Sequence, residues 1–354
     1  GMKKVVKFIS QAVILLMVVS LLAGCGAAST PSSDDTSDQT AAPEEKLKVG
    51  LSFPTQREEI WVKDKVLLEQ EAEKQGIELL VQVSDNDAAK QQAQCENLLS
   101  QGIEVLIVGA HDGKAAATIV EKAHEMGVKV ISFERLILDS DPDVYISFDN
   151  VKVGNVQGDW FVSHVDKGNI VILSGDPLDN NAKLFKQGAM EKLQPKIDSG
   201  DYTVVMEQAV KDWQPGEAMK LMENALTANK NNIQGVLAPN DGTAGGCIQA
   251  LAAQGLDGKI PITGQDAELA GLQRIVEGVQ GMTVFKDSRV ICKATIEAAI
   301  KLANGEDLGA NNTVNNGKMD VLSILCTPTA IDESNIDEIL IDGGVFVKED
   351  IYKQ

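Results

Sequence analysis

The sequence has few basic residues, few aromatic residues and few cysteines for its length of 354 residues. Its 32 Lys and Arg stand against 52 Asp and Glu, which gives a net charge of −20. A chain of that charge is repelled by nucleic acid, so no nucleic-acid partner is expected. Five cysteines do not make a disulfide scaffold. A hydrophobic content of 44% excludes wholesale disorder, and the length suits two domains of roughly 150 residues each.

The sequence also lacks the common motifs of catalysis and metal binding. It contains no phosphate-binding G-x-x-x-x-G-K-[ST] loop and no G-x-S-x-G elbow. The three histidines lie far apart and share no metal-ligand spacing, so neither a metal nor a cofactor is expected. Paired acids for glycosidase chemistry are conceivable among Glu134, Asp179 and Asp266. Each has a basic or amide neighbour that favours the ionised form, so the sequence predicts a binding protein rather than an enzyme.

The N-terminus has the pattern of an export signal. Three lysines precede an apolar run from Phe8 to Ala23, which is shorter than the roughly 20 residues of a membrane anchor. The run ends in Leu22-Ala23-Gly24-Cys25, which resembles the lipobox of bacterial lipoproteins, where the cysteine becomes the lipidated first residue. We therefore expect a signal peptide over residues 1–24 and lipidation of Cys25. The alternative is an uncleaved helix that happens to contain Cys25.

Residues 26–45 have the composition of a flexible tether. They are rich in Ser, Thr, Asp, Ala and Pro and offer little to bury. Cleavage at Cys25 removes three lysines and no acid, which changes the net charge from −20 to −23. The sequence thus predicts an extracytoplasmic protein that is lipid-anchored to the cell membrane, with residues 25–45 as lipidated cysteine and tether.

From Leu47 the chain alternates short apolar runs with longer amphipathic stretches. Such runs are typical of strands buried on both faces of a parallel sheet, and the stretches have the i, i+3, i+4, i+7 stripe of covering helices. The expected strands are 47–53, 77–83, 103–109, 128–133, 169–174, 202–209, 233–238 and 260–264, with a late strand at 283–285 and a helix near 290–303. Gly76, Gly102 and Gly127 are expected to end helices in the left-handed conformation. The pattern occurs twice, which predicts an α/β fold of two doubly wound parallel-sheet lobes.

In doubly wound sheets the ligand lies beyond the carboxyl ends of the strands. The residues that follow the expected strands are acids, amides and cations with one aromatic: Arg57, Asp85, Asn86, His111, Asp112, Glu134, Arg135, Asp176, Asp179, Asn180, Asn181, Asp212, Trp213, Asn240, Asp241, Gln265, Asp266 and Lys286. A sugar hydroxyl both donates and accepts, so acids or amides on one side and cations on the other suit it. An indole can cover the apolar face of the ring. These side chains predict a cleft that closes on a small polyol.

A helix cap is the competing explanation for several of these residues. Asp and Asn begin helices for local reasons, and we favour that role for Asp85, Asn86, Asp112 and Asp241. Arginine and tryptophan do not cap helices. Arg135, Trp213 and Asp266 are therefore stronger candidates for ligand contacts.

Several motifs in order resemble sugar-binding proteins of the type I periplasmic-binding fold, and most of all the D-xylose-binding proteins of ABC importers. These motifs are Tyr145-Ile-Ser-Phe-Asp-Asn150, Asp179-Asn-Asn-Ala-Lys-Leu-Phe185, Leu221-Met-Glu-Asn-Ala-Leu-Thr-Ala-Asn229, Asn240-Asp-Gly-Thr-Ala-Gly-Gly246 and Gly264-Gln-Asp-Ala-Glu-Leu-Ala-Gly271. The resemblance implies three hinge crossovers, near 148–151, 283–286 and 320–327. It also implies an N-terminal lobe of 46–148 plus 286–320 and a C-terminal lobe of 149–285 plus 321–354.

The resemblance further implies a set of sugar contacts. Those that match the family are Arg57, Arg135, Asn181, Trp213, Asn240, Asp266 and Lys286, together with Asp179. Glu134 stands where these proteins usually have Asp, and its extra methylene moves the carboxylate by about 1 Å. The loop Pro54–Gln56 also departs from the family pattern.

The resemblance implies capture without catalysis by a monomer that passes its sugar to an ABC permease. A sensing role, with a sensor kinase or chemoreceptor as partner, stays open, as does glucose or another aldose in place of xylose. A Cys292–Cys326 disulfide stays open too.

Overall fold

The computed structural model describes residues 43–310 and 312–353. The expected signal peptide, Cys25 and nearly all of the tether lie outside the described residues. The chain from Glu45 onward forms one compact unit. Among the described residues, none of the helices has both the length and the apolar character needed to cross a membrane.

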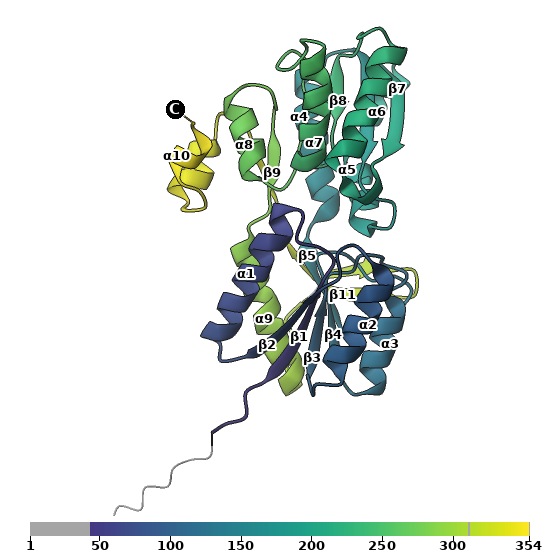
Figure 1. Ribbon diagram of the computed structural model, residues 1–354. Helices are drawn as coiled ribbons and strands as arrows, with labels where there is room; N and C mark the ends of the chain where they lie inside the picture. The colour runs from purple at the N-terminus through teal and green to yellow at the C-terminus, as the bar shows by residue number, and fades with distance from the viewer. Residues whose placement is uncertain (1–42, 311, 354) are drawn as a thin grey trace, which may run out of the picture. The chain divides into compact units, whose positions relative to one another are not determined.

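The first lobe is built on a seven-stranded sheet in the order β10-β11-β5-β4-β3-β1-β2 (Figure 1). Its strands are β1 (Lys48–Phe53), β2 (Glu78–Val83), β3 (Val105–Val108), β4 (Lys129–Phe133), β5 (Val144–Phe148), β10 (Asn312–Asn315) and β11 (Asp320–Cys326). All neighbouring pairs are parallel except β10 and β11. The helices are α1 (Glu59–Lys74), α2 (Ala88–Leu99), α3 (Ala117–Glu125) and α9 (Ser288–Asn304).

Helices cover both faces of this sheet. Leu51 on β1 packs in one core with Leu68 of α1 and Ile296 of α9. Leu106 on β3 packs in another core with residues of α2 and α3, including Ile119. Alternate side chains of a strand point to opposite faces, so a strand buried on both faces is apolar throughout, as the sequence pattern predicts.

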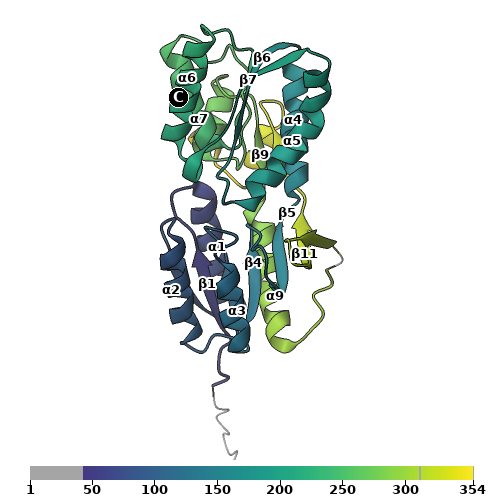
Figure 2. The same cartoon turned by 90° about the vertical axis from the view of Figure 1, so that its right-hand side faces the viewer.

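The second lobe has a three-stranded parallel sheet in the order β7-β6-β8, with α4 and α5 on one side and α6 and α7 on the other (Figure 2). Its elements are α4 (Asn150–His164), β6 (Gly168–Ser174), α5 (Asn180–Asp198), β7 (Tyr202–Ala209), a 3-10 turn (Lys211–Trp213), α6 (Pro215–Ala228), β8 (Gly235–Leu237), α7 (Asp241–Ala253) and α8 (Leu269–Val276). An antiparallel pair, β9 (Thr283–Phe285) and β12 (Thr329–Ile331), is followed by a π-helical turn (Asp337–Asp342) and α10 (Lys348–Ile351).

These elements confirm the predicted α/β fold with two doubly wound lobes. Seven of the eight regularly spaced strands begin within two residues of the expected position, and the three helix-ending glycines have φ of 72°, 79° and 72°. The eighth, 260–264, forms only a single bridge from Ile262 to Val236. Pro261 lies in this segment and has no N–H to donate, which limits a parallel ladder here.

The chain passes between the lobes after β5, after β9 and after β11, because the next element in each case belongs to the other lobe. The expected boundary at 320/321 is wrong. β11 pairs with β5 from Ser323↔Tyr145 to Cys326↔Phe148, so residues 320–326 belong to the first lobe. The four described cysteines, Cys95, Cys247, Cys292 and Cys326, are free, so Cys292 and Cys326 are not bridged.

Candidate ligand-binding site

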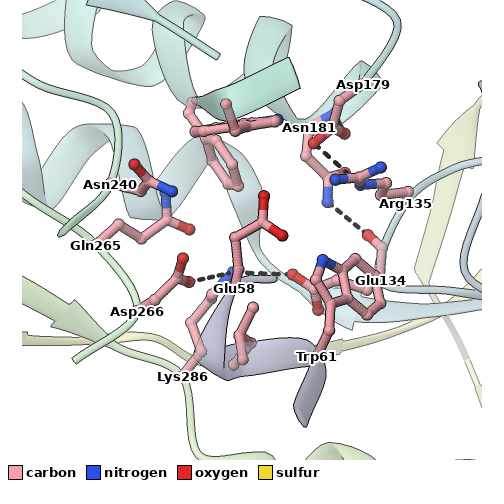
Figure 3. A pocket seen from close by; sticks show the side chains of 13 residues that line it. Glu58, Trp61, Glu134, Arg135, Asp179, Asn181, Asn240, Gln265, Asp266 and Lys286 are labelled. Carbon is pink, nitrogen blue, oxygen red and sulfur yellow. Dashed lines mark hydrogen bonds and ion pairs between the residues drawn. The ribbon is translucent and has the colours of Figure 1, made fainter. Parts of the chain in front are cut away.

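A pocket with about 380 Å³ of space free of protein atoms lies between the two lobes, at the carboxyl ends of their strands (Figure 3). The residues that line it are Glu58, Ile60, Trp61, Glu134, Arg135, Asp179, Asn181, Phe185, Trp213, Asn240, Gln265, Asp266 and Lys286. Eight of the nine predicted site residues are among them, and Arg57 is the exception.

Glu134 is held by its backbone at the end of β4. Its φ is 62°, a conformation that is uncommon for residues other than Gly, Asn and Asp. Its carbonyl oxygen accepts hydrogen bonds from Tyr145 Oη (2.8 Å), Ser147 Oγ (2.9 Å) and Asn181 Nδ2 (2.6 Å). Asn181 belongs to the second lobe, so one of these bonds crosses between the lobes. The three donors fix the backbone from which the Glu134 carboxylate reaches the pocket.

Lys286 holds two carboxylates, one from each lobe. Its Nζ lies 2.8 Å from Glu134 Oε1 and 3.2 Å from Asp266 Oδ1, and all three side chains are almost wholly buried. Burial alone would lower the pKa of Lys286, but the charges of Asp266 and Glu134 outweigh it and raise that pKa. Lys286 is therefore a fixed cation under the pocket.

A second ion pair links the lobes on the other side of the pocket. Arg135 Nε lies 3.3 Å from Asp179 Oδ2, and Arg135 Nη1 donates to the Ala110 carbonyl at 3.1 Å. Burial raises the pKa of Asp179, and the Arg135 charge opposes that shift. The Arg135 guanidinium also lies 5.2 Å from the centre of the Trp61 ring, within cation–π range.

Trp213 reaches the pocket from the 3-10 turn after β7. It is 7% exposed and meets Phe185 edge-on, with 6.3 Å between ring centres. Gly175, which follows β6, leaves room for this ring, because a Cβ there would lie 2.0 Å from the Trp213 ring. Trp213 itself has φ 55°. The indole is thus fixed by a strained turn and by a glycine in the adjacent loop.

Four buried polar atoms on the pocket wall have no hydrogen-bond partner within the protein. Three are acceptors, Glu58 Oε2, Gln265 Oε1 and Asp266 Oδ1, and one is a donor, Trp213 Nε1. Asp266 Oδ1 does lie within ion-pair distance of Lys286. Buried polar atoms are nearly always paired, so a cluster of unpaired ones indicates where a ligand supplies the partners.

A family model described as a periplasmic binding protein domain matches residues 49–307. The D-xylose-binding periplasmic protein of Escherichia coli K12 is 44% identical over 309 residues, which are 87% of this chain and 93% of that protein. The chain belongs to the periplasmic binding protein family. These matches confirm the resemblance seen in the sequence motifs.

Two more distant relatives widen the range of the family. The multiple sugar-binding periplasmic receptor ChvE of Rhizobium radiobacter is 35% identical, with 85% of this chain and 91% of that protein covered. A carbohydrate transporter solute-binding protein from Chloroflexus aurantiacus, solved in complex with D-glucose, is 34% identical. Its TM-score is 0.83, and the match covers 87% of this chain and 99% of that one.

In this periplasmic binding protein Arg57 lies at the edge of the pocket. Its side chain is 37% exposed, and its Nη2 lies 3.4 Å from Glu58 Oε1. The same nitrogen donates to the carbonyl of Asp212, next to Trp213 on the other lobe. Arg57 therefore connects the lobes outside the pocket, and its contact with a ligand stays a prediction.

Sequence reasoning missed four lining residues: Glu58, Ile60, Trp61 and Phe185. Glu58, Ile60 and Trp61 lie at the start of α1, beyond the loop that follows β1, where the strand-end rule gives no exact position. Phe185 lies one helical turn after Asn181 and so shares its face of α5, a spacing that could have identified it. Gln265 was named at the same strand end as Asp266 but not among the expected sugar contacts, and it also lines the pocket.

The predicted caps are wrong at α2 and α7. Asp87, rather than Asp85 or Asn86, caps α2 through a bond from Lys90 N. Asn240 caps α7 and forms a capping box with Thr243. Asp241 is instead fully buried and accepts hydrogen bonds from Gln265 N (3.1 Å), Glu268 N (2.9 Å) and Gln280 Nε2 (2.7 Å). It ties the loop that carries Gln265 and Asp266 to α7.

The fourth predicted cap, Asp112, does not cap α3, whose first flanking residue is Ala116. Its Oδ1 accepts from Lys114 N and Ala115 N in the turn before that helix.

Within residues 43–310 and 312–353, no group of three or more His, Cys, Asp or Glu side chains could hold a metal ion.

Proposed function

We propose that this chain is an extracytoplasmic solute-binding lipoprotein that captures a monosaccharide and delivers it to an ABC permease. D-xylose is the first candidate for that monosaccharide. The chain binds the sugar as a monomer, without catalysis and without a cofactor. The 44% identity to the D-xylose-binding protein of Escherichia coli supports the choice of sugar.

The observation that carries the proposal is the set of unpaired polar atoms on the pocket wall. Glu58 Oε2 and Gln265 Oε1 require donors from the ligand, and the Trp213 indole N–H requires an acceptor. Each hydroxyl of a sugar is both a donor and an acceptor, so a small polyol can satisfy all three atoms. The rings of Trp61, Phe185 and Trp213 supply the apolar surface for the C–H groups of such a ligand.

Thermal unfolding of the mature protein with D-xylose, D-glucose, D-ribose, L-arabinose and D-galactose tests the proposal. A sugar at 100 times its Kd adds about 2.7 kcal/mol, which raises Tm by a few degrees for domains of this size. We expect the largest shift with D-xylose. If no sugar shifts Tm at millimolar concentration, the proposal is wrong.

Two alternatives have specific support. D-glucose is the second candidate ligand, because the Chloroflexus aurantiacus relative was solved with it. A sensing role is the second candidate function, because one relative is named a receptor. Uptake of labelled sugar by cells that lack this chain separates the roles: loss of uptake supports delivery to a permease, and normal uptake supports sensing.

The lipid anchor has its own test at Cys25. Cys25→Ser should move the protein from the membrane fraction to the soluble fraction and leave its sugar affinity unchanged, because pocket residues begin at Glu58. Fractionation with a salt wash, with Cys95→Ser as the control at a buried cysteine, provides the measurement. Retention of the Cys25→Ser protein on membranes contradicts lipidation at this residue.

A further inference from the structure

Glu58 lies at the entrance to α1, and its side chain does not serve the helix. The residue occupies the N-cap position with extended backbone (φ −81°, ψ 136°), but its side chain makes no capping hydrogen bond. The carboxylate is instead directed into the pocket, as Figure 3 shows. A carboxylate at this position is stabilised when it accepts hydrogen bonds from the first backbone N–H groups of the helix. The Glu58 carboxylate makes no such bond, so the helix does not set its orientation.

The Glu58 carboxylate is buried with one oxygen unpaired. Its side chain is 11% exposed, and Oε2 has no hydrogen-bond partner. Its Oε1 lies 3.4 Å from Nη2 of Arg57, whose own side chain is 37% exposed. A weak contact with a half-exposed guanidinium does not satisfy a buried carboxylate.

The other acids of the pocket differ in this respect. Glu134 and Asp266 share the buried cation Lys286, and Asp179 faces the buried Arg135. Glu58 is thus the one acid among the described lining residues without a buried cation as partner. A carboxylate oxygen accepts hydrogen bonds, so the group that satisfies Oε2 is a donor.

We propose that Glu58 contacts the bound sugar directly and selects ligands that present a hydrogen-bond donor, a hydroxyl group, to its Oε2. This inference rests on the proposed sugar-binding function and adds a specificity-determining residue to it. A ligand that lacks the hydroxyl leaves a buried carboxylate oxygen unpaired, and sites of this kind reject such analogues strongly.

Calorimetric titration with D-xylose, D-glucose and the monodeoxy analogues of whichever sugar binds more tightly tests the inference. In the wild-type protein, removal of one particular hydroxyl should weaken binding by about 10- to 100-fold. In Glu58→Leu, which has no polar atoms at this position, the parent sugar and that deoxy analogue should bind equally. Glu58→Gln, which keeps one carbonyl acceptor, should retain part of the difference.

Glu73→Gln is the matched control, since Glu73 lies on the same helix and is exposed. It should reproduce the wild-type preferences. Equal weakening of every sugar and every analogue in Glu58→Leu, or no change at all, overturns the inference. If Glu58→Leu does not fold, by circular dichroism, the same comparison is made with Glu58→Gln, and a full wild-type preference there overturns it. If the wild-type protein binds no sugar, the proposed function fails as well, so the two failures are distinguishable.

Discussion

Buried carboxylates occur in two surroundings in this protein. On the pocket wall, Glu134 and Asp266 face Lys286, and Asp179 faces Arg135. Behind the wall, Asp64 on α1 is 1% exposed, with a cysteine, Cys292, as the neighbour of its carboxylate (3.9 Å). Burial, and next the charge of Glu134, raises the pKa of Asp64 to about 8.

Two further acids lie close together behind the pocket wall, Asp241 at the start of α7 and Glu268 just before α8. Burial raises the pKa values of both residues, and nearby acids raise each of these values further. The two surroundings differ in the neighbours of the acids. A buried cation lies beside Glu134, Asp266 and Asp179, whereas the acids behind the pocket lie near other acids, and burial together with those acids raises their pKa values.

Removal of the Lys286 cation is expected to have the largest effect on stability and sugar affinity. Lys286→Met leaves two buried carboxylates without their partner, which should destabilise the fold by about 3–5 kcal/mol. Sugar affinity should fall by at least about 30-fold, or 2 kcal/mol, because two pocket carboxylates then lose the cation that holds them in position. Urea unfolding and calorimetric titration measure the two effects.

Lys293→Met is the control for Lys286→Met. Lys293 is exposed on α9 and lies 3.9 Å from Glu297, and exposed pairs contribute about 0–1 kcal/mol. If Lys286→Met costs no more than Lys293→Met in stability and affinity, the role assigned to Lys286 is wrong.

The pH dependence of stability tests the raised pKa of Asp64, an acid behind the pocket wall. Its pKa is raised from 3.8 to about 8 in the folded protein, so between those values the folded state holds a proton that the unfolded state has lost. The stability supplied by Asp64 is therefore complete below about pH 4 and falls as pH rises to about 8, by up to about 1.4 kcal/mol per pH unit. Asp64→Asn removes this dependence, and sugar affinity should stay within a few-fold because Asp64 does not line the pocket.

Urea unfolding at intervals from pH 5 to pH 9 provides the measurement for Asp64→Asn. Asp159→Asn, at an exposed position on α4, should keep the wild-type slope. Equal slopes for the wild type and Asp64→Asn contradict a protonated Asp64.

The sequence predicted most of the fold because each βα unit repeats a local pattern. It also predicted that Arg135, Trp213 and Asp266 share one site, because parallel strands end at the same edge of a sheet. It could not place β11, since membership in a lobe depends on pairing with β5, more than a hundred residues away in the chain. Long-range pairing of this kind leaves no local pattern in the sequence.

Errors of one residue account for other differences between sequence and structure. Asn240 rather than Asp241 caps α7, and Glu58 rather than Arg57 lines the pocket. Backbone angles in a loop decide which of two neighbouring residues caps a helix or lines a pocket. The residue types alone do not determine those angles. The pairing of Lys286 with Glu134 was equally hidden, because the two residues lie 152 positions apart.

The variant Glu268→Gln is expected to change stability least. It tests whether an acid without a buried cation as neighbour destabilises the folded protein at high pH. Burial, and then the charges of Asp241, Asp266, Glu59 and Glu58, raises the pKa of Glu268, so its ionisation opposes folding as pH rises. The side chain is only partly buried, so solvent screening limits the effect. Glu268→Gln should stabilise the protein by about 1 kcal/mol or less at pH 9 and have no effect at pH 4.

Urea unfolding of Glu268→Gln at these two pH values gives the sign directly, with the exposed Glu104→Gln as control. Because Glu268 does not line the pocket, calorimetric titration should show wild-type sugar affinity. A variant less stable than the wild type at pH 9 would mean that Glu268 makes a favourable ionic contact in the folded state. In that case the surroundings of Glu268 would not be the purely acidic ones to which its raised pKa is assigned.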